Sequence, residues 1–137
     1  MLLLLTSLAS AVELNSSASS RPLTMPEPRT CIDGLFADDP EFAVFEGLTI
    51  EQISQSMDDF IPELMRCVPK GASLNGVAEL QLSVGCDGRV SAVSVNTAQN
   101  LSPELTACVS NTIRYASFPA HDTPDGVEFL YPMRFQF

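Results

Sequence analysis

Basic side chains are scarce in this chain of 137 residues. Seven Lys and Arg stand against 17 Asp and Glu, which gives a formal net charge of −10 at pH 7. A protein that binds the phosphate backbone of nucleic acid needs a basic stripe to displace counterions, so we expect no nucleic-acid partner. Long apolar runs are also missing. None reaches the roughly 18 residues that a spanning helix needs, so we expect no spanning membrane helix in the mature chain.

Metal-binding patterns are equally sparse. The chain has one His and four Cys, and no two cysteines form a Cys-x-x-Cys pair, so the usual spacing of a structural zinc site is missing. Asp87-Gly88 matches only a fragment of a calcium loop, and we interpret it as a turn. His121 lies near Asp122 and Asp125 in a loop with Pro and Gly, where solvated polar residues are usual. We therefore predict no metal, no cofactor and no enzymatic activity.

The first residues have the form of an export signal. The apolar stretch Leu2 to Leu8 precedes Ala9-Ser10-Ala11, a small-x-small pattern that signal peptidase accepts. Residues 1–11 are therefore predicted to be a signal peptide, although no Lys or Arg precedes the stretch, and the alternative is a frayed hydrophobic tail. Because the even number of cysteines fits an oxidising compartment, we expect the protein in the periplasm or secreted.

Two polar segments follow the predicted signal. Residues 12–30 are rich in Ser, Pro and Asn. They bury too little apolar surface to offset their ordering entropy, which predicts a flexible polar tether that folding does not require. Residues 31–48 combine acidic residues with Phe36, Phe42 and Phe45. This stretch is either an acidic-aromatic recognition segment or a surface collar that packs its aromatic side chains onto the domain, and we favour the collar.

Residues 49–137 predict one domain that begins with a helix. Thr49-Ile50-Glu51-Gln52 has the pattern of a capping box. Pro62 is expected to kink or split the helix, and Pro69 and Gly71 end it. The apolar stripe of this helix, at steps of three and four residues, consists of Ile50, Ile53, Met57, Phe60, Ile61, Leu64 and Val68.

A hairpin follows the first helix. Residues 77–84 alternate apolar and polar side chains, as a half-buried strand does. Cys86-Asp87-Gly88 forms the turn to a return strand over residues 89–96. Within that strand, a slip in the alternation at Ala92-Val93 indicates a bulge.

A second helix and a last strand complete the domain. Ser102-Pro103-Glu104 starts a helix that runs to about Tyr115. Residues 127–137 alternate over one apolar face, and Pro132 places this strand at a sheet edge because proline cannot donate to a ladder. A right-handed crossover then gives the strand order 2-1-3. We predict an α+β fold in which two helices pack on one face of a three-stranded antiparallel sheet.

The cysteines fit a structural role in this fold. Cys67 and Cys108 fall on the core faces of the two helices. This favours a bridge over a redox pair, because reactive thiols need exposed, electropositive surroundings. Four cysteines allow three connectivities, and with Cys67 joined to Cys108, exclusion pairs Cys31 with Cys86.

Several short motifs occur together in this domain: Met65-Arg66-Cys67, Val84-Gly85-Cys86-Asp87-Gly88-Arg89-Val90, Leu105-Thr106-Ala107-Cys108-Val109, Phe118-Pro119 and Tyr131-Pro132-Met133-Arg134-Phe135. With them, the segment from Thr49 to Phe137 resembles the TonB C-terminal domain family, in particular the variant at the ends of myxobacterial gliding-motility and energy-transducer proteins. The resemblance implies the same fold and a domain that captures a peptide of an outer-membrane partner by adding a strand to its sheet. Transducers of that family carry an inner-membrane helix and a Pro-rich spacer, and this chain has neither, so we expect a free-standing exported module rather than an energy transducer.

The function that follows is a protein-interaction module of the cell envelope, which binds an extended peptide or a protein partner by strand addition. The predicted binding edge consists of Phe129, Leu130, Tyr131, Met133, Arg134 and Phe135. The alternative is a structural subunit of an envelope complex, or a homo-oligomer whose edge pairs with its own copy. A further alternative is that residues 31–48 fold back and cover the edge.

Overall fold

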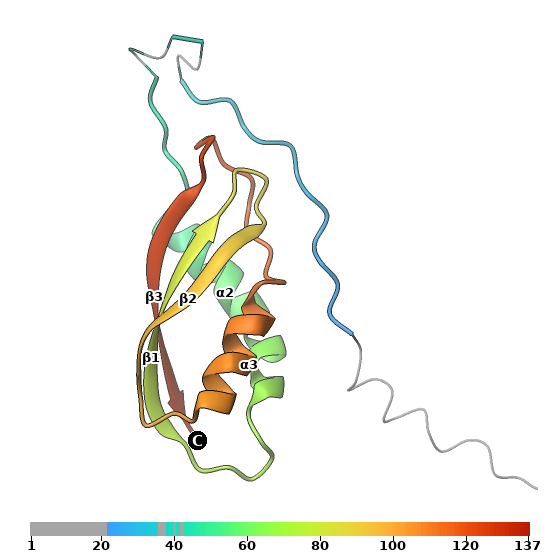
Figure 1. Cartoon of the computed structure of the whole chain (residues 1–137). Helices are drawn as coiled ribbons and strands as arrows, with labels where there is room; N and C mark the ends of the chain where they lie inside the picture. The colour runs from blue at the N-terminus through green and yellow to red at the C-terminus, as the bar shows by residue number, and fades with distance from the viewer. Residues whose placement is uncertain (1–21, 36–37, 40, 42) are drawn as a thin grey trace, which may run out of the picture.

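The structure, a computed structural model, describes residues 22–35, 38–39, 41 and 43–137. The predicted signal peptide and the first part of the predicted tether lie outside these residues. The described elements follow the predicted order: α2 (Ile50–Leu64), the short 3-10 helix η1 (Met65–Cys67), β1 (Asn75–Val84), β2 (Val90–Gln99), α3 (Pro103–Ile113) and β3 (Val127–Gln136) (Figure 1). None of the helices in the described part of the chain has the length and apolar character to cross a membrane.

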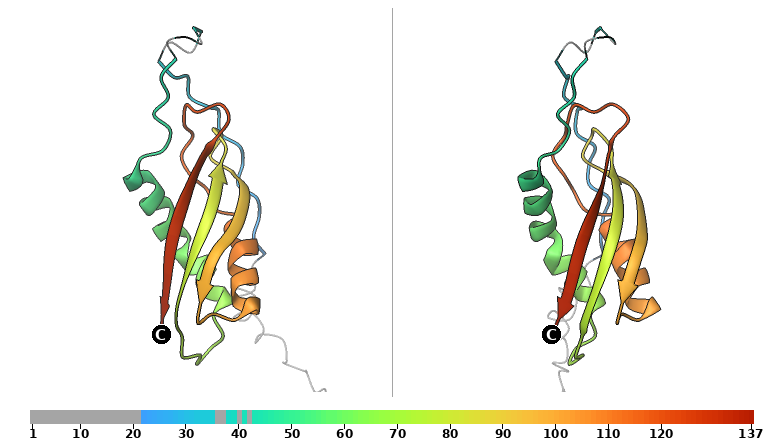
Figure 2. Two further views of the ribbon diagram at one scale, coloured as in Figure 1. Left: turned by 60° about the vertical axis from the view of Figure 1, so that its left-hand side comes forward. Right: turned by 90° about the vertical axis from the view of Figure 1, so that its left-hand side faces the viewer.

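The three strands form one antiparallel sheet in the order β2-β1-β3. Helices α2 and α3 lie together against one face of it, and the other face has no helix in the described part of the chain (Figure 2). The predicted α+β architecture and the predicted strand order are both confirmed. β1 is therefore the central strand, and β2 and β3 are the two edges.

Helix α2 begins at the predicted capping box. The Thr49 hydroxyl accepts the N–H of Gln52 at 3.1 Å, and the Gln52 side chain accepts the N–H of Thr49 at 2.9 Å. Of the two outcomes expected at Pro62, a kink or a split, the split does not occur, because α2 continues through Pro62 to Leu64. Pro62 and Asp58, whose carbonyl loses its partner, are both exposed, so water can replace the missing hydrogen bond.

The predicted apolar stripe of α2 is wider than the face that the sheet covers. Met57 and Leu64 are buried, whereas Ile50 is 77% exposed and Ile61 is 41% exposed. Ile50 and Ile61 are eleven residues apart, which is three turns of an α-helix, so they point the same way along one flank. Including them in the core stripe was wrong.

The pairing of β2 with β1 is interrupted by a β-bulge at two places. The register shifts between Glu79 and Leu80 and between Ser83 and Val84, which leaves Asn96 and Ser91 as the extra residues on β2. The predicted bulge at Ala92-Val93 is thus one residue from an observed one. The other bulge was missed. Together they bring Val90, Val93 and Val95 to the helix-covered side, opposite Val84, Leu82 and Leu80.

Helix α3 begins after Ser102, whose hydroxyl accepts the N–H of Leu105 at 3.1 Å. It ends at Ile113, two residues before the predicted end. Phe137, predicted as the last residue of the apolar row of β3, lies beyond the strand and is half exposed.

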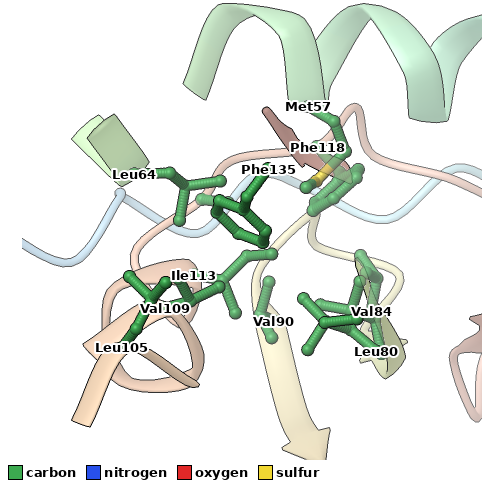
Figure 3. Packing of buried hydrophobic residues seen from close by; sticks show 13 residues of the cluster. Met57, Leu64, Leu80, Val84, Val90, Leu105, Val109, Ile113, Phe118 and Phe135 are labelled. Carbon is green, nitrogen blue, oxygen red and sulfur yellow. The ribbon is translucent and has the colours of Figure 1, made fainter. Parts of the chain in front are cut away.

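The core lies between the two helices and the sheet (Figure 3). Every second side chain of β1 from Ala78 to Val84 is buried. The remaining core residues come from the helices, β2, β3 and the segment after α3: Met57, Leu64, Val90, Leu105, Val109, Ile113, Ala116, Phe118 and Phe135. Phe118 packs edge-on against Phe129 with ring centroids 5.9 Å apart, which fixes the start of β3 on the core.

Candidate functional site

The free side of β3 is the candidate site. β3 pairs with β1 over its whole length, and no other described strand pairs with it. An unpaired row of backbone N–H and C=O groups is a template for another strand.

One hydrogen bond determines which backbone groups of β3 belong to that row. Phe137 donates its N–H to the carbonyl oxygen of Leu74 at 2.9 Å, and the two residues continue the register in which Asn75 lies opposite Gln136. In an antiparallel ladder, residues that bond to the neighbour alternate with residues whose backbone groups face the other side. The odd-numbered residues of β3 therefore bond to β1, and the even-numbered residues face outward.

Pro132 agrees with this assignment, because its missing N–H falls in the outward row, where no ladder bond is lost. The outward N–H donors are those of Glu128, Leu130, Arg134 and Gln136. Of the predicted edge residues, only Leu130 and Arg134 offer backbone groups to a new strand. The backbone groups of the other four, Phe129, Tyr131, Met133 and Phe135, are directed at β1 in this register.

Sequence reasoning thus missed Glu128 and Gln136. The signal that could have found them is Pro132 itself. Once proline is placed outward at an edge, every residue at an even distance from it along the strand faces outward too.

The side chains of β3 form two rows. The odd-numbered row faces the helices and is packed against the core, with Phe135 buried and Phe129 and Tyr131 half-buried. The even-numbered row is exposed on the face without helices, and Leu130 retains 53% of its surface there. A shallow hollow on that face is lined by side chains of all three strands, including Glu79, Thr97 and Pro132.

On the helix-covered face of the sheet, helix α2 lies beside the free edge of β3. Residues on one flank of α2, such as Gln52 and Asp59, line a hollow with Arg29 and Pro119. The opposite flank contains the exposed apolar residues at the edge side of the helix, which are Ile50, Ile61 and Met65. Asp58, on this same flank, lies close enough to β3 to act on Tyr131. Burial of the phenol, followed by the charge of Asp58, raises the pKa of Tyr131 above its ordinary value.

The described residues of segment 31–48 leave the free side of β3 open. No backbone hydrogen bond joins these residues to β3. Leu35 and Val44 form an isolated antiparallel bridge. Leu48 packs against the core, but Val44 and Phe45 remain about half exposed. Phe36 and Phe42 lie outside the described residues.

Asp122 anchors the last part of this segment, where the chain comes back to the domain. Its carboxylate accepts the N–H of Glu46 at 2.9 Å and the N–H of Gly47 at 2.8 Å. These two backbone donors, Glu46 first, lower the pKa of Asp122 below its ordinary value. Asp122 therefore acts as an anchor in this structure.

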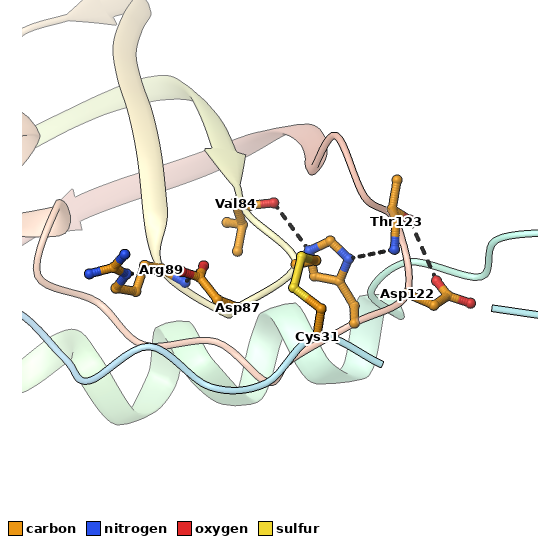
Figure 4. Close-up of a disulfide and its surroundings, with 8 residues drawn as sticks. Cys31, Val84, Asp87, Arg89, Asp122 and Thr123 are labelled. Atoms are coloured by element: carbon orange, nitrogen blue, oxygen red, sulfur yellow. Dashed lines mark hydrogen bonds and ion pairs between the residues drawn. A yellow bond between two sulfur atoms is a disulfide. The ribbon is translucent and has the colours of Figure 1, made fainter. Parts of the chain in front are cut away.

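Both predicted disulfides are present. Cys67 and Cys108 join η1 to α3 with Cα atoms 5.7 Å apart, and Cys31 and Cys86 join the N-terminal segment to the hairpin turn with Cα atoms 5.0 Å apart (Figure 4). Two disulfides fit an oxidising compartment. The backbone N–H of Arg29 also donates to the carbonyl of Asp87, so the chain before Cys31 runs along the domain.

His121 is part of the same local framework. It is 2% exposed, its Nε2 lies 3.1 Å from the carbonyl oxygen of Val84, and its Nδ1 accepts the N–H of Thr123 (Figure 4). Both ring nitrogens are thus used to hold the loop. The described residues contain no group of three or more His, Cys, Asp or Glu that could hold a metal ion.

No family model and no curated protein matches the chain. Among solved structures, the chain is similar to the NMR solution structure of the TonB C-terminal domain from Helicobacter pylori, with a TM-score of 0.41 and 17% sequence identity. The match covers 67% of this chain and 96% of that chain. The likeness concerns the fold and says nothing about what either chain binds. The finer resemblance to the myxobacterial variant stays a prediction.

Proposed function

We propose that this chain is an exported protein-interaction module, which binds an extended segment of a protein partner as a fourth strand beside β3. The observation that supports the proposal is the unpaired outward row of β3, which no described segment covers. Backbone hydrogen bonds give such a complex its affinity, and alternate side chains of the added strand give it specificity.

The two sides of the edge differ in what they offer the added strand. Side chains that turn toward the helices meet the α2 flank with Ile61 and Met65, so apolar residues fit there. Side chains that turn the other way lie beside Glu128, Leu130 and Arg134. An alternating peptide, apolar toward the helices and polar outward, fits both sides.

We place this activity in the periplasm or outside the cell. The two disulfides and the signal-like residues 1–11 support that location. The partner is accordingly a protein or peptide of the cell envelope.

Random linear peptides displayed on phage provide a probe that presumes no partner. Peptides selected on the immobilised protein, and then synthesised, should protect the outward amides of Glu128, Leu130, Arg134 and Gln136 from hydrogen exchange. Leu130→Pro removes one outward donor and should weaken binding roughly tenfold, because one hydrogen bond is lost. The matched control, Leu130→Ala, keeps that donor and should bind much more tightly than Leu130→Pro. Selected peptides that bind equally well to both variants and leave these amides unprotected would contradict the proposal.

A further inference from the structure

A groove beside helix α3 is occupied by the chain's own N-terminal segment. Two hollows meet there at Tyr115, which lines both, and together they form what we call the α3 groove. Leu23 lines the first hollow, and Met25 lines the second. In Figure 1 the segment that contains them, drawn in blue, runs on the opposite side of the helices from the sheet. The α3 groove is therefore distinct from the free edge of β3.

The first hollow suits an apolar side chain. The half-buried Cys67–Cys108 disulfide lines it together with Thr112 and Tyr115. The Thr112 hydroxyl lies 3.5 Å from the Sγ of Cys67 and 3.9 Å from that of Cys108. Disulfide sulfurs have no hydrogen, so the hydroxyl is the donor and its hydrogen is directed at the bridge. What remains for the half-buried Leu23 is sulfur, a methyl group and an aromatic ring.

The charged side chains at this hollow are already paired with each other. Glu63 and Arg66 both line it, and they form an ion pair at 2.9 Å. A ligand therefore needs no charge of its own at this position.

The second hollow lies between the start of β2 and the end of α3. Val90 and Ser91 line it from β2, and Asn111 and Arg114 line it from α3 and its C-terminal cap. Met25 fills only part of it, because half of the methionine surface (50%) stays exposed. The groove thus holds its present occupant loosely.

No backbone hydrogen bond fastens this occupant to the domain. Residues 22–28 make none in the structure and belong to no helix or strand. Pro22, Pro26 and Pro28 restrict the segment to extended conformations, so it loses little entropy on docking. The Cys31–Cys86 bridge attaches it to the domain at one end. A segment that is preformed, weakly held and attached at one end can be replaced by a similar segment of another protein.

We propose that the α3 groove is a second binding site of this chain, which takes an extended segment of a protein partner with the pattern Pro-apolar-x-apolar. Residues 22–25, Pro-Leu-Thr-Met, imitate that ligand within the chain and compete with it. Aromatic-lined grooves bind proline-containing segments in this way, because a preformed backbone makes docking cheap in entropy. The inference goes beyond the proposed function and does not depend on the edge of β3.

The chain's own segment should close the groove only part of the time. A short tether gives it an effective concentration of about 1 to 2 mM. If the free segment binds with a dissociation constant of about 1 mM, the tethered one occupies the groove for roughly half to two-thirds of the time. A partner segment then binds the wild type about two- to threefold more weakly than it binds an open groove.

A double variant of the full chain, Leu23→Ser with Met25→Ser, opens the groove without shortening the protein. In two-dimensional NMR we expect its Ser91, Thr112 and Tyr115 amide signals to shift away from their wild-type positions. A capped synthetic peptide of residues 22–28 should return them, with a dissociation constant about two- to threefold lower than for the wild type.

Two controls accompany this titration. Thr24→Ser changes a residue that lines neither hollow, so this variant should bind the peptide as the wild type does. A peptide with Ser in place of both apolar residues should move none of the three amide signals. The inference is wrong if the unmodified peptide leaves Tyr115 unmoved in the double variant, if the Ser-containing peptide binds equally well, or if the wild type binds as tightly as the double variant.

The class of partner can be tested with random peptides displayed on phage. Phage bound to the double variant and then eluted with the peptide of residues 22–28 carry the sequences that the groove selects. These sequences should share proline beside an apolar-x-apolar pair. Eluted sequences without that pattern would overturn the assignment of the ligand.

Failure of this inference can be separated from failure of the proposed function, because the two surfaces are different. The peptide of residues 22–28 should leave the outward amides of Leu130 and Arg134 unchanged. Shifts at those amides instead of at Tyr115 would overturn the groove and leave the edge proposal in place. A protein that binds this peptide at Tyr115 but selects no edge-binding peptide retains the groove alone.

Discussion

Pro132 lies opposite Glu79 in the ladder between β3 and β1, and the backbone groups of the two residues face away from each other. Those of Glu79 turn toward β2, and those of Pro132 turn toward the solvent. A proline is tolerated in the middle of this long strand because that position donates to nothing within the fold. The same alternation makes β3 an edge with a defined set of free donors.

Hydrogen exchange along β3 should alternate with a period of two residues. The amides of Leu130, Arg134 and Gln136 should exchange roughly a hundredfold faster than those of Tyr131 and Met133, because only the latter are bonded to β1. Two-dimensional NMR in deuterated buffer resolves each amide. Uniform exchange rates, or fast exchange at the odd-numbered positions, would contradict the assignment.

Proline substitutions should show the same alternation in stability. Leu130→Pro should change the free energy of unfolding little relative to Leu130→Ala, because no internal hydrogen bond is removed. Tyr131→Pro should cost about 1 to 3 kcal/mol more than Tyr131→Ala, since the bonded carbonyl of Leu80 loses its donor. Urea unfolding of the four variants measures both differences. Equal penalties at the two positions would show that the edge is misassigned.

The elements of this fold were predictable because their signals are local. The capping box at Thr49, the Ser-Pro-Glu start of α3 and the alternation in the strands each depend on neighbouring residues. Pro132 also predicted a feature of the tertiary structure, because a proline within a long strand indicates that the strand lies at a sheet edge. The order β2-β1-β3 then followed from the handedness of the crossover.

What escaped prediction depends on contacts between distant segments. Ile50 and Ile61 have the spacing of core residues, and only the position of α2 relative to the edge leaves them exposed. His121 lies in a polar loop that suggested a solvated side chain. Its burial depends on the contact with Val84, which lies 37 residues away in the sequence.

The two disulfides should differ in what they stabilise. Replacing Cys67 and Cys108 together with Ala should lower the free energy of unfolding by about 2 to 4 kcal/mol, because that bridge joins the two helices across 41 residues of sequence. Urea unfolding under non-reducing conditions measures the loss. Replacing Cys31 and Cys86 should in addition increase the mobility of residues 29–32 in NMR relaxation, whereas the helix bridge should leave that segment unaffected. A mobile segment in the Cys67/Cys108 variant would contradict this division.

The residues before Arg29 should be dispensable for folding. Of the described part, residues 22–28 have no backbone hydrogen bond to the domain, and the first such bond is made by Arg29. Deleting residues 12–28 should therefore change the melting temperature by no more than about 2 °C. A deletion that also removes Arg29 to Cys31 is the comparison, and it should lower the melting temperature because it removes a disulfide. A fall of many degrees in the shorter deletion would show that this segment is a structural arm.

Acid should release Glu46 and Gly47, near the end of segment 31–48, from Asp122 before it unfolds the domain. The N–H groups of Glu46 and Gly47 lower the pKa of Asp122, so its contribution to stability is fully present above the unfolded pKa and is lost as the pH falls through the lower, folded pKa. The amide signals of Glu46 and Gly47 should therefore shift with a common midpoint below about pH 3.9, the ordinary value for Asp.

Asp122→Asn should abolish that shift and flatten the dependence of stability on pH between about pH 5 and pH 2. Asp125→Asn removes the same charge from the same loop. Since neither N–H donates to Asp125, this control should keep the titration of Glu46 and Gly47 intact. A shift of both amides that persists in Asp122→Asn would mean that another group anchors the segment.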